Sequence, residues 1–123
     1  MLNPRHALGA RAEAATAAWL TTRGWSVLAR RWRCAHGELD LVALDPQGVL
    51  VAIEVKLRST DHSGTPWASV DGRRLRRLRS ALGCFVAEAH GLVREGIRVD
   101  LVAVRPAENG QWRLTHHRAI DAW

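Results

Sequence analysis

The sequence predicts an α/β (α+β) fold in which a central mixed β-sheet of about five strands is flanked by helices. Two helix-spaced apolar stretches and one strong β-hairpin signal lead to this prediction. The order along the chain is helix, three strands, helix and two strands, which is typical of helices layered on a sheet. At 123 residues the chain supports one hydrophobic core, so we expect residues 1–123 to form a single domain.

The first helix is predicted over residues 5–23. Its apolar residues recur at helical spacing, and Gly24 directly after it favours a C-terminal stop. The apolar positions are Leu8, Ala12, Ala15, Trp19 and Leu20. Residues 25–32 follow as a first strand, in which Trp25 and Val27 fall on one face.

Residues 37–58 carry the hairpin signal. Two β-prone runs, 37–44 and 49–58, flank the segment Pro46–Gly48. Its proline suits the first corner of a type I turn, and its glycine can take the positive φ that closes a three-residue loop. Asp45 is therefore expected to face Val49.

This loop sets the register of the whole hairpin. Asp40 then faces Glu54, and Glu38 faces Lys56, with all four side chains on one face of the sheet. Facing carboxylates repel and destabilise a sheet, so a hard divalent cation between Asp40 and Glu54 is a natural candidate. The alternative is a solvated face on which Glu38 and Lys56 offset the repulsion.

Loop composition marks residues 59–67, which follow the hairpin directly. Such a loop could act as a flap over a substrate. His62 in it could shuttle a proton, although a lone loop histidine is more often only solvated. Ser69 or Asp71 can cap the second helix, whose apolar ridge runs over residues 75–89.

Two further strands are predicted after this helix, over residues 97–104 and 111–115, joined by a turn at Asn109-Gly110. Beyond them, His116 and His117 are adjacent. Neighbouring residues on a strand point to opposite faces, so we do not expect these two histidines to share one metal ion.

Composition narrows the function classes. The formal net charge is +6 and the sequence pI is about 11.1, which favours a nucleic-acid partner, although basicity by itself can serve solubility alone. Cys34 and Cys84 build neither a disulfide framework nor a zinc site, so a reducing cytoplasmic location fits best. No signal peptide or bilayer-length apolar run is present, and no membrane partner is expected.

Lys56 is the only lysine among the 18 basic residues. Wherever a positive charge only has to be solvated, the chain carries arginine. A lysine is a compact charge that can shift its pKa and transfer a proton, whereas a guanidinium stays charged. Lys56 lies two residues after Glu54, on the same strand face and roughly 6.5 to 7 Å away, which leaves room for a water between them.

The second helix begins with five arginines in seven residues, with no acid among them until Glu88. Solvated helix faces normally mix both signs of charge. The excess therefore favours contact with phosphates over a merely wet surface. The arginines are Arg73, Arg74, Arg76, Arg77 and Arg79.

The spacing of Asp40 and Glu54-Val55-Lys56 resembles the signature of the restriction-endonuclease-like, or PD-(D/E)xK, nucleases. Together with the segments 37–43, 54–58 and 98–102, it resembles the YraN-type family of predicted bacterial endonucleases. These small proteins are distantly similar to archaeal Holliday-junction resolvases. The resemblance spans nearly the whole chain. No proline precedes the aspartate, and Arg74 stands where the family often carries lysine.

This resemblance implies a restriction-endonuclease-like core and a catalytic set of Glu13, Asp40, Glu54 and Lys56. From its position in the predicted helix alone, Glu13 would be a solvated residue beside the apolar stripe. Asp40, Glu54 and the Val55 carbonyl would hold Mg²⁺ or Mn²⁺ through oxygen. The nucleic-acid contacts expected are Arg58, Arg73, Arg74, Arg76, Arg77 and Arg79.

The function expected is metal-dependent hydrolysis of phosphodiester bonds in DNA, selective for structure such as branches, flaps or ends. No small-molecule cofactor is expected, and a homodimer is among the assemblies considered. One alternative is a non-catalytic nucleic-acid-binding module with the same fold. Another is an adaptor that docks an acidic protein on the arginine helix.

Overall fold

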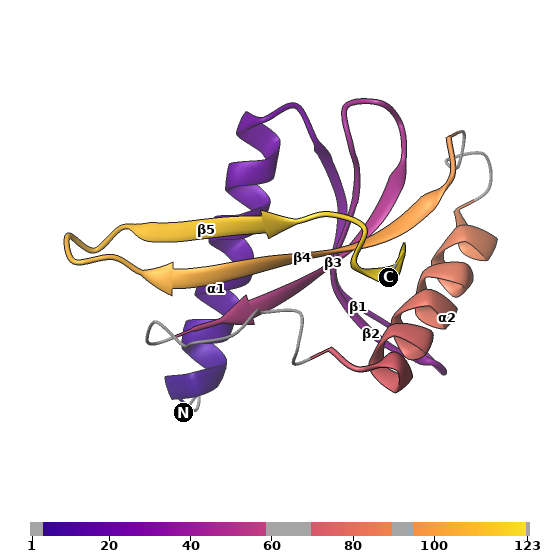
Figure 1. Ribbon diagram of the computed structural model, residues 1–123, viewed down its shortest axis with the longest axis horizontal. Helices are drawn as coiled ribbons and strands as arrows, with labels where there is room; N and C mark the ends of the chain where they lie inside the picture. The colour runs from indigo at the N-terminus through magenta and orange to yellow at the C-terminus, as the bar shows by residue number, and fades with distance from the viewer. Residues whose placement is uncertain (1–3, 59–69, 90–94, 123) are drawn as a thin grey trace.

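The computed structural model describes residues 4–58, 70–89 and 95–122. Figure 1 shows the elements in chain order: α1 (Pro4–Thr22), β1 (Ser26–Cys34), β2 (Gly37–Leu44), β3 (Leu50–Leu57), α2 (Gly72–Glu88), β4 (Ile97–Pro106), β5 (Trp112–His117) and the short 3₁₀ helix η2 (Ile120–Ala122). The predicted order of helices and strands is confirmed. The predicted flap at residues 59–67, His62 and the candidate cap Ser69 lie outside the described residues.

The five strands form one mixed sheet with the order β1-β2-β3-β4-β5. Only β3 and β4 are parallel among the described strands, because α2 forms the crossover between them. The two helices lie on opposite faces: α1 packs on one face and α2 on the other (Figure 1). This confirms the predicted mixed sheet flanked by helices.

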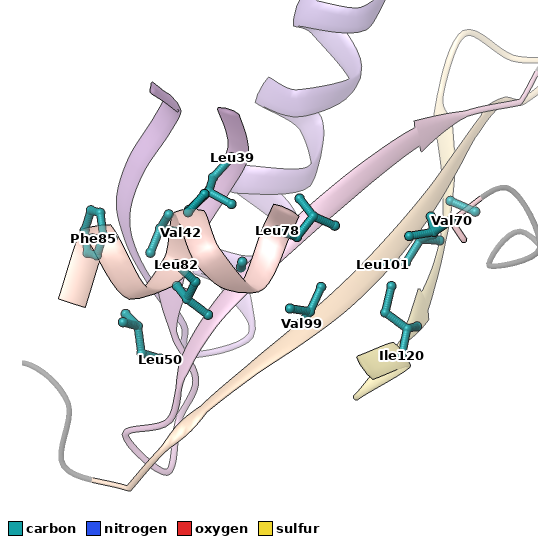
Figure 2. Packing of buried hydrophobic residues seen from close by; sticks show 13 residues of the cluster. Leu39, Val42, Leu50, Val70, Leu78, Leu82, Phe85, Val99, Leu101 and Ile120 are labelled. Atoms are coloured by element: carbon teal, nitrogen blue, oxygen red, sulfur yellow. The ribbon is translucent and has the colours of Figure 1, made fainter. Parts of the chain in front are cut away.

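The core has two layers because β3 is buried on both sides. Leu50 and Ala52 belong to the layer under α2, and Val51 and Ile53 to the layer under α1. A strand covered on both faces reads as a continuous apolar run, as this one does. Figure 2 shows the α2 side, where the helix packs over β2, β3 and β4. The large side chains there are Leu39, Val42, Leu50, Leu78, Leu82, Phe85, Val99 and Leu101.

The predicted hairpin register is confirmed next to the turn, but the pairing stops before the predicted facing pairs Asp40–Glu54 and Glu38–Lys56. Leu41 faces Ile53 and Leu44 faces Leu50. The turn closes with the Asp45 N–H donating to the Val49 carbonyl at 2.9 Å, and Gly48 takes φ +89°, a conformation that a side chain would strain. The loop that joins β2 to β3 therefore determines which residues reach the site described below.

Asp71 caps α2, since its carboxylate accepts the Arg74 backbone N–H at 2.8 Å. The second half of the sheet runs further than predicted. β4 continues to Pro106, and β5 ends at His117 and so includes both histidines. No helix in the described ranges has the length and apolar character required to cross a bilayer.

Candidate active site

The paired part of the β2–β3 hairpin ends at Leu41 and Ile53. In an antiparallel ladder every second pair of residues exchanges backbone hydrogen bonds. If the alternation that starts at Asp45–Val49 continued past Leu41–Ile53, the Val55 N–H would donate to the backbone of β2. It donates instead to the carboxylate of Asp40, with 2.9 Å between Val55 N and Asp40 Oδ2. The Asp40 carboxyl group therefore lies in the gap where the two strands part.

An irregularity in β1 and β2 directs Asp40 into this gap. Leu39 packs under α2 and Leu41 under α1, although residues two apart on a regular strand share a face. Opposite Asp40, Arg31 on β1 has φ +51°, one of the few positive values at a non-glycine residue in the described chain. Residues held in this left-handed region are strained and are concentrated at functional sites.

Glu54 lies on the α2 side of the sheet and is only 4% exposed. Its Oε2 accepts a hydrogen bond from Arg74 Nε of α2 at 2.9 Å and lies 2.7 Å from Nη2 of the same guanidinium. Burial, followed by the adjacent Glu54 carboxyl group, raises the pKa of Asp40 to about 8, and the Val55 N–H offsets only part of that rise. Without a cation, Asp40 therefore retains its proton at neutral pH.

Val55 adds a backbone oxygen to this pair. The N–H and C=O of a strand residue point to the same side, so the Val55 carbonyl faces β2, as its N–H does. Successive residues of a strand direct their backbone groups alternately to the two neighbouring strands. Arg58 donates its N–H to Val104 of β4, so Val55, an odd number of residues away, directs its carbonyl away from β4. Asp40, Glu54 and the Val55 carbonyl thus offer oxygen donors around one gap.

Lys56 follows on β3 and shares the face of Glu54 by strand alternation. Its side chain is partly buried, and within the described part of the chain it makes no hydrogen bond or ion pair. Glu38 does not pair with it. Glu38 Oε2 instead lies 3.0 Å from Arg33 Nε on β1. The lysine is therefore available to a ligand at this edge of the gap.

Glu13, the fourth predicted catalytic residue, comes from α1. Its Oε1 accepts Nε of Arg31 at 2.7 Å, and its charge contributes to the raised pKa of Asp40. Residues 4–58, 70–89 and 95–122 contain no group of three or more histidine, cysteine or acidic side chains placed to hold one ion. The structure thus brings Asp40 and Glu54 together and leaves Glu13 beside them, held by arginine.

The family profile described as "Uncharacterised protein family UPF0102" matches residues 12–104. The chain belongs to the UPF0102 family. A UPF0102 protein of Beutenbergia cavernae is 40% identical over 119 residues, which cover 97% of this chain and 99% of the relative. One of Moorella thermoacetica is 42% identical over 104 residues, 85% of each chain. This is the YraN-type family indicated by the sequence motifs.

The UPF0102 match contains the four predicted catalytic residues and the arginines of α2, whereas β5 lies beyond it. Those arginines divide into two groups. Arg74 holds Glu54, and Arg79 pairs with Asp121 near η2. The others are exposed and have no hydrogen bond or ion pair among the described residues. They are Arg73, Arg76 and Arg77.

A pocket of about 310 Å³ opens beside the gap, between the β1–β2 turn and the first turns of α2. Its lining residues are Ala35, His36, Gly37, Glu38, Arg74, Arg77 and Leu78. Arg74 belongs both to this pocket and to the carboxylate pair. Sequence reasoning missed His36, because a lone histidine in a short turn carries no signal until the turn is placed against the helix.

Proposed function

We propose that this UPF0102 protein is a divalent-metal-dependent nuclease that hydrolyses phosphodiester bonds in DNA. One observation carries the proposal. Two carboxyl groups from adjacent strands, Asp40 and Glu54, meet in a gap short of positive charge, beside the chain's only lysine. Buried like charges with a strongly raised pKa are typical of functional sites.

The donor set suits Mg²⁺ or Mn²⁺. Both ions prefer oxygen ligands, and Asp40, Glu54 and the Val55 carbonyl are all oxygen donors. A divalent ion would place positive charge next to the Asp40 carboxyl group and so favour its ionised form. When bound, such an ion polarises a phosphate and stabilises the charge that develops on it during hydrolysis.

Lys56 would activate the attacking water, and the arginines would bind the nucleic acid. Lys56 would hold the attacking water through a hydrogen bond and assist the loss of its proton. Glu13, beside Asp40, would help to order this water or the ion. Arg58 and the exposed arginines of α2 would contact phosphates, which fixes the position of a duplex without reading its bases. Selection by DNA shape, such as branches, flaps or ends, follows from that.

Cleavage of labelled duplex, branched and single-stranded DNA, with Mn²⁺ or with a chelator, tests the proposal. We expect metal-dependent product from the wild type, a loss of about 10²- to 10⁴-fold for Lys56→Ala, and binding that survives in this variant. Lys56→Arg keeps the charge but not the compact ammonium, so it should also fail to cleave. Glu108→Gln, an exposed acid in the β4–β5 turn, is the matched control. Cleavage by Lys56→Ala at the wild-type rate would remove the assignment.

The second candidate is a non-catalytic nucleic-acid-binding module. The ion pair between Arg74 and Glu54 favours it, since a carboxylate satisfied by arginine is a common structural feature. This candidate predicts salt-sensitive binding of DNA or RNA without any metal-dependent product. The same incubation, followed by a binding titration at two salt concentrations, separates the two.

A further inference from the structure

Arg74 stands at the junction of the carboxylate gap and the neighbouring pocket. Both of its polar contacts with Glu54 are to the same oxygen, Oε2: Nε donates a hydrogen bond at 2.9 Å, and Nη2 lies 2.7 Å away in the ion pair. The Glu54 side chain is 4% exposed, whereas that of Arg74 is 36% exposed. The carboxylate is therefore fixed in the sheet, and the guanidinium reaches it from solvent on a long side chain.

The position of Arg74 in its helix makes this contact unusual. It lies in the first turn of α2, where its own backbone N–H is capped by Asp71. The N-terminal end of a helix carries partial positive charge and disfavours a cation. The helix thus provides no reason for an arginine here, whereas Glu54 does. In the structure the guanidinium is the ion-pair partner of Glu54.

A divalent ion and Arg74 would compete for Glu54. A cation held by Asp40, Glu54 and the Val55 carbonyl would place two positive charges close to the guanidinium, and like charges repel. Arg74 also lines the 310 Å³ pocket, with Arg77 and His36. The one acid in that pocket, Glu38, is already paired with Arg33 at 3.0 Å. A phosphate group in the pocket would offer the displaced guanidinium a bidentate partner.

We propose that Arg74 is a positioning residue that couples metal binding to phosphate binding. It holds Glu54 while the gap lacks a metal ion, and it turns to a backbone phosphate of the nucleic acid in the pocket lined by His36, Arg74 and Arg77 when the ion binds. This inference rests on the proposed function, since it requires a divalent ion at Asp40 and Glu54. It places the phosphate next to the scissile one over the β1–β2 turn.

The first test is a calorimetric titration of the protein with Mn²⁺ without nucleic acid. Arg74→Gln should bind Mn²⁺ about fivefold to tenfold more tightly than the wild type, because no guanidinium has to be displaced. If Arg74 only supported the position of Glu54, the same variant would bind Mn²⁺ more weakly. Arg73→Gln, an exposed neighbour that does not line the pocket, is the matched control and should leave the affinity unchanged.

The second test measures the affinity for a fluorescently labelled DNA duplex with and without Ca²⁺, an oxygen-seeking ion. We expect Ca²⁺ to raise the affinity of the wild type by about tenfold, and to raise that of Arg74→Gln far less. Arg74→Lys keeps one positive charge without the bidentate fork, so its gain should be intermediate. This conservative variant keeps the proposal testable should Arg74→Gln fail to fold.

The outcomes separate this inference from the proposed function. If the wild type binds Mn²⁺ no better than Asp40→Asn does, both proposals fail. If Asp40→Asn loses Mn²⁺ but Arg74→Gln binds it equally or more weakly than the wild type, only the coupling fails. A gain in DNA affinity of equal size in wild type and Arg74→Gln would also overturn the coupling.

Discussion

Two pairs of buried or partly buried carboxylates lie in or next to the same sheet and are satisfied in opposite ways. Asp45 and Asp100 share Arg98, whose Nη1 lies 2.6 Å from Asp45 Oδ2 and whose Nε lies 2.9 Å from Asp100 Oδ1. His116 Nε2 at 2.8 Å and the Ala119 N–H at 2.9 Å also contact Asp100. Burial pushes the pKa of Asp100 upward, but the hydrogen bonds from His116 and Arg98 outweigh it, and the pKa lies below its usual value.

Asp40 and Glu54 are the other pair. Arg74 binds Glu54 alone, and the backbone hydrogen bond to Asp40 comes from Val55. Here burial and the neighbouring carboxyl group prevail, and the pKa of Asp40 is raised instead of lowered. The β2–β3 pairing also stops short of Asp40 and Glu54, whereas Asp45 lies directly beyond its paired end at Leu44–Leu50.

The difference teaches how to tell a structural acid from a functional one. A carboxylate surrounded by enough donors stabilises the folded state and has no need of a ligand. A buried pair with too few donors costs stability until something positive binds to it. The loss of stability at Asp40 and Glu54 is the physical basis for expecting a cation there. The effects of mutation and of pH on stability should therefore differ between the two pairs.

The largest expected effect is on stability when one acid of each pair is neutralised. Asp100→Asn leaves the partly buried Arg98 with part of its charge unmatched, so the free energy of unfolding should fall by about 3 to 5 kcal/mol. At pH 7 Asp40 already holds its proton, so Asp40→Asn exchanges one neutral side chain for another and stability should change little. Urea denaturation of both variants at pH 7, without divalent ions, measures the two effects.

Glu108→Gln is the control for loss of an acid as such, because Glu108 is exposed on the β4–β5 turn. Its free energy of unfolding should lie within about 0.5 kcal/mol of the wild-type value. Equal destabilisation by Asp40→Asn and Asp100→Asn would mean that both pairs are structural, and the contrast between them would disappear.

The second prediction concerns pH. The folded state holds a proton on Asp40 up to a pKa of about 8, against 3.8 for an ordinary aspartate. Between these values the folded state binds more protons than the unfolded state, so stability falls as pH rises from 4 to 8. We expect a contribution on the order of 2 to 3 kcal/mol, below the full linkage value because water reaches the partly buried site. Denaturation midpoints across this range measure it.

Asp45 and Asp100 act in the opposite direction. Their pKa values are lowered, so their contribution is present above pH 4 and is lost as pH falls below it. Asp40→Asn should therefore flatten the profile between pH 4 and 8 and leave the acid limb intact. Mn²⁺ should stabilise the wild type more at pH 8 than at pH 5.5. A wild-type profile unchanged by Asp40→Asn would show that Asp40 is ionised throughout.

Much of this site follows from local sequence. The segment Pro46–Gly48 fixes the hairpin register, and the register brings Asp40 and Glu54 directly beyond the last pair of the ladder, Leu41–Ile53. The cap at Asp71 follows in the same way, because a cap is a contact between near neighbours in sequence.

Contacts between distant elements could not be predicted in this way. Arg74 and Glu54 are brought together only by the packing of α2 on the sheet, and an arginine-rich helix gives no sign of which arginine turns inward. His116 meets Asp100 from the neighbouring strand β5, and Arg98, on the same strand as Asp100, also reaches the distant Asp45, so sequence reasoning saw only a strand and a pair of histidines. The positive φ of Arg31 could not be predicted either, since arginine is not a residue expected in that conformation.

The smallest expected effect tests the positive φ of Arg31, which lies opposite Asp40. At Arg31, with φ +51°, glycine avoids the strain that alanine suffers. Arg31→Gly should therefore be more stable than Arg31→Ala by about 1 kcal/mol, because both variants lose the same bond to Glu13 and differ only in backbone preference. Urea denaturation of the two variants side by side measures the difference.

Arg33 is the matched position, because it is also an exposed arginine on β1 that pairs with one acid, Glu38. Its backbone φ is not positive, so glycine there should be less stable than alanine by about 0.5 to 1 kcal/mol. Opposite signs at two positions of one strand would locate the strain at Arg31, facing Asp40. The same sign at both would mean that β1 is relaxed at Arg31, and that the direction of Asp40 into the gap depends on β2 alone.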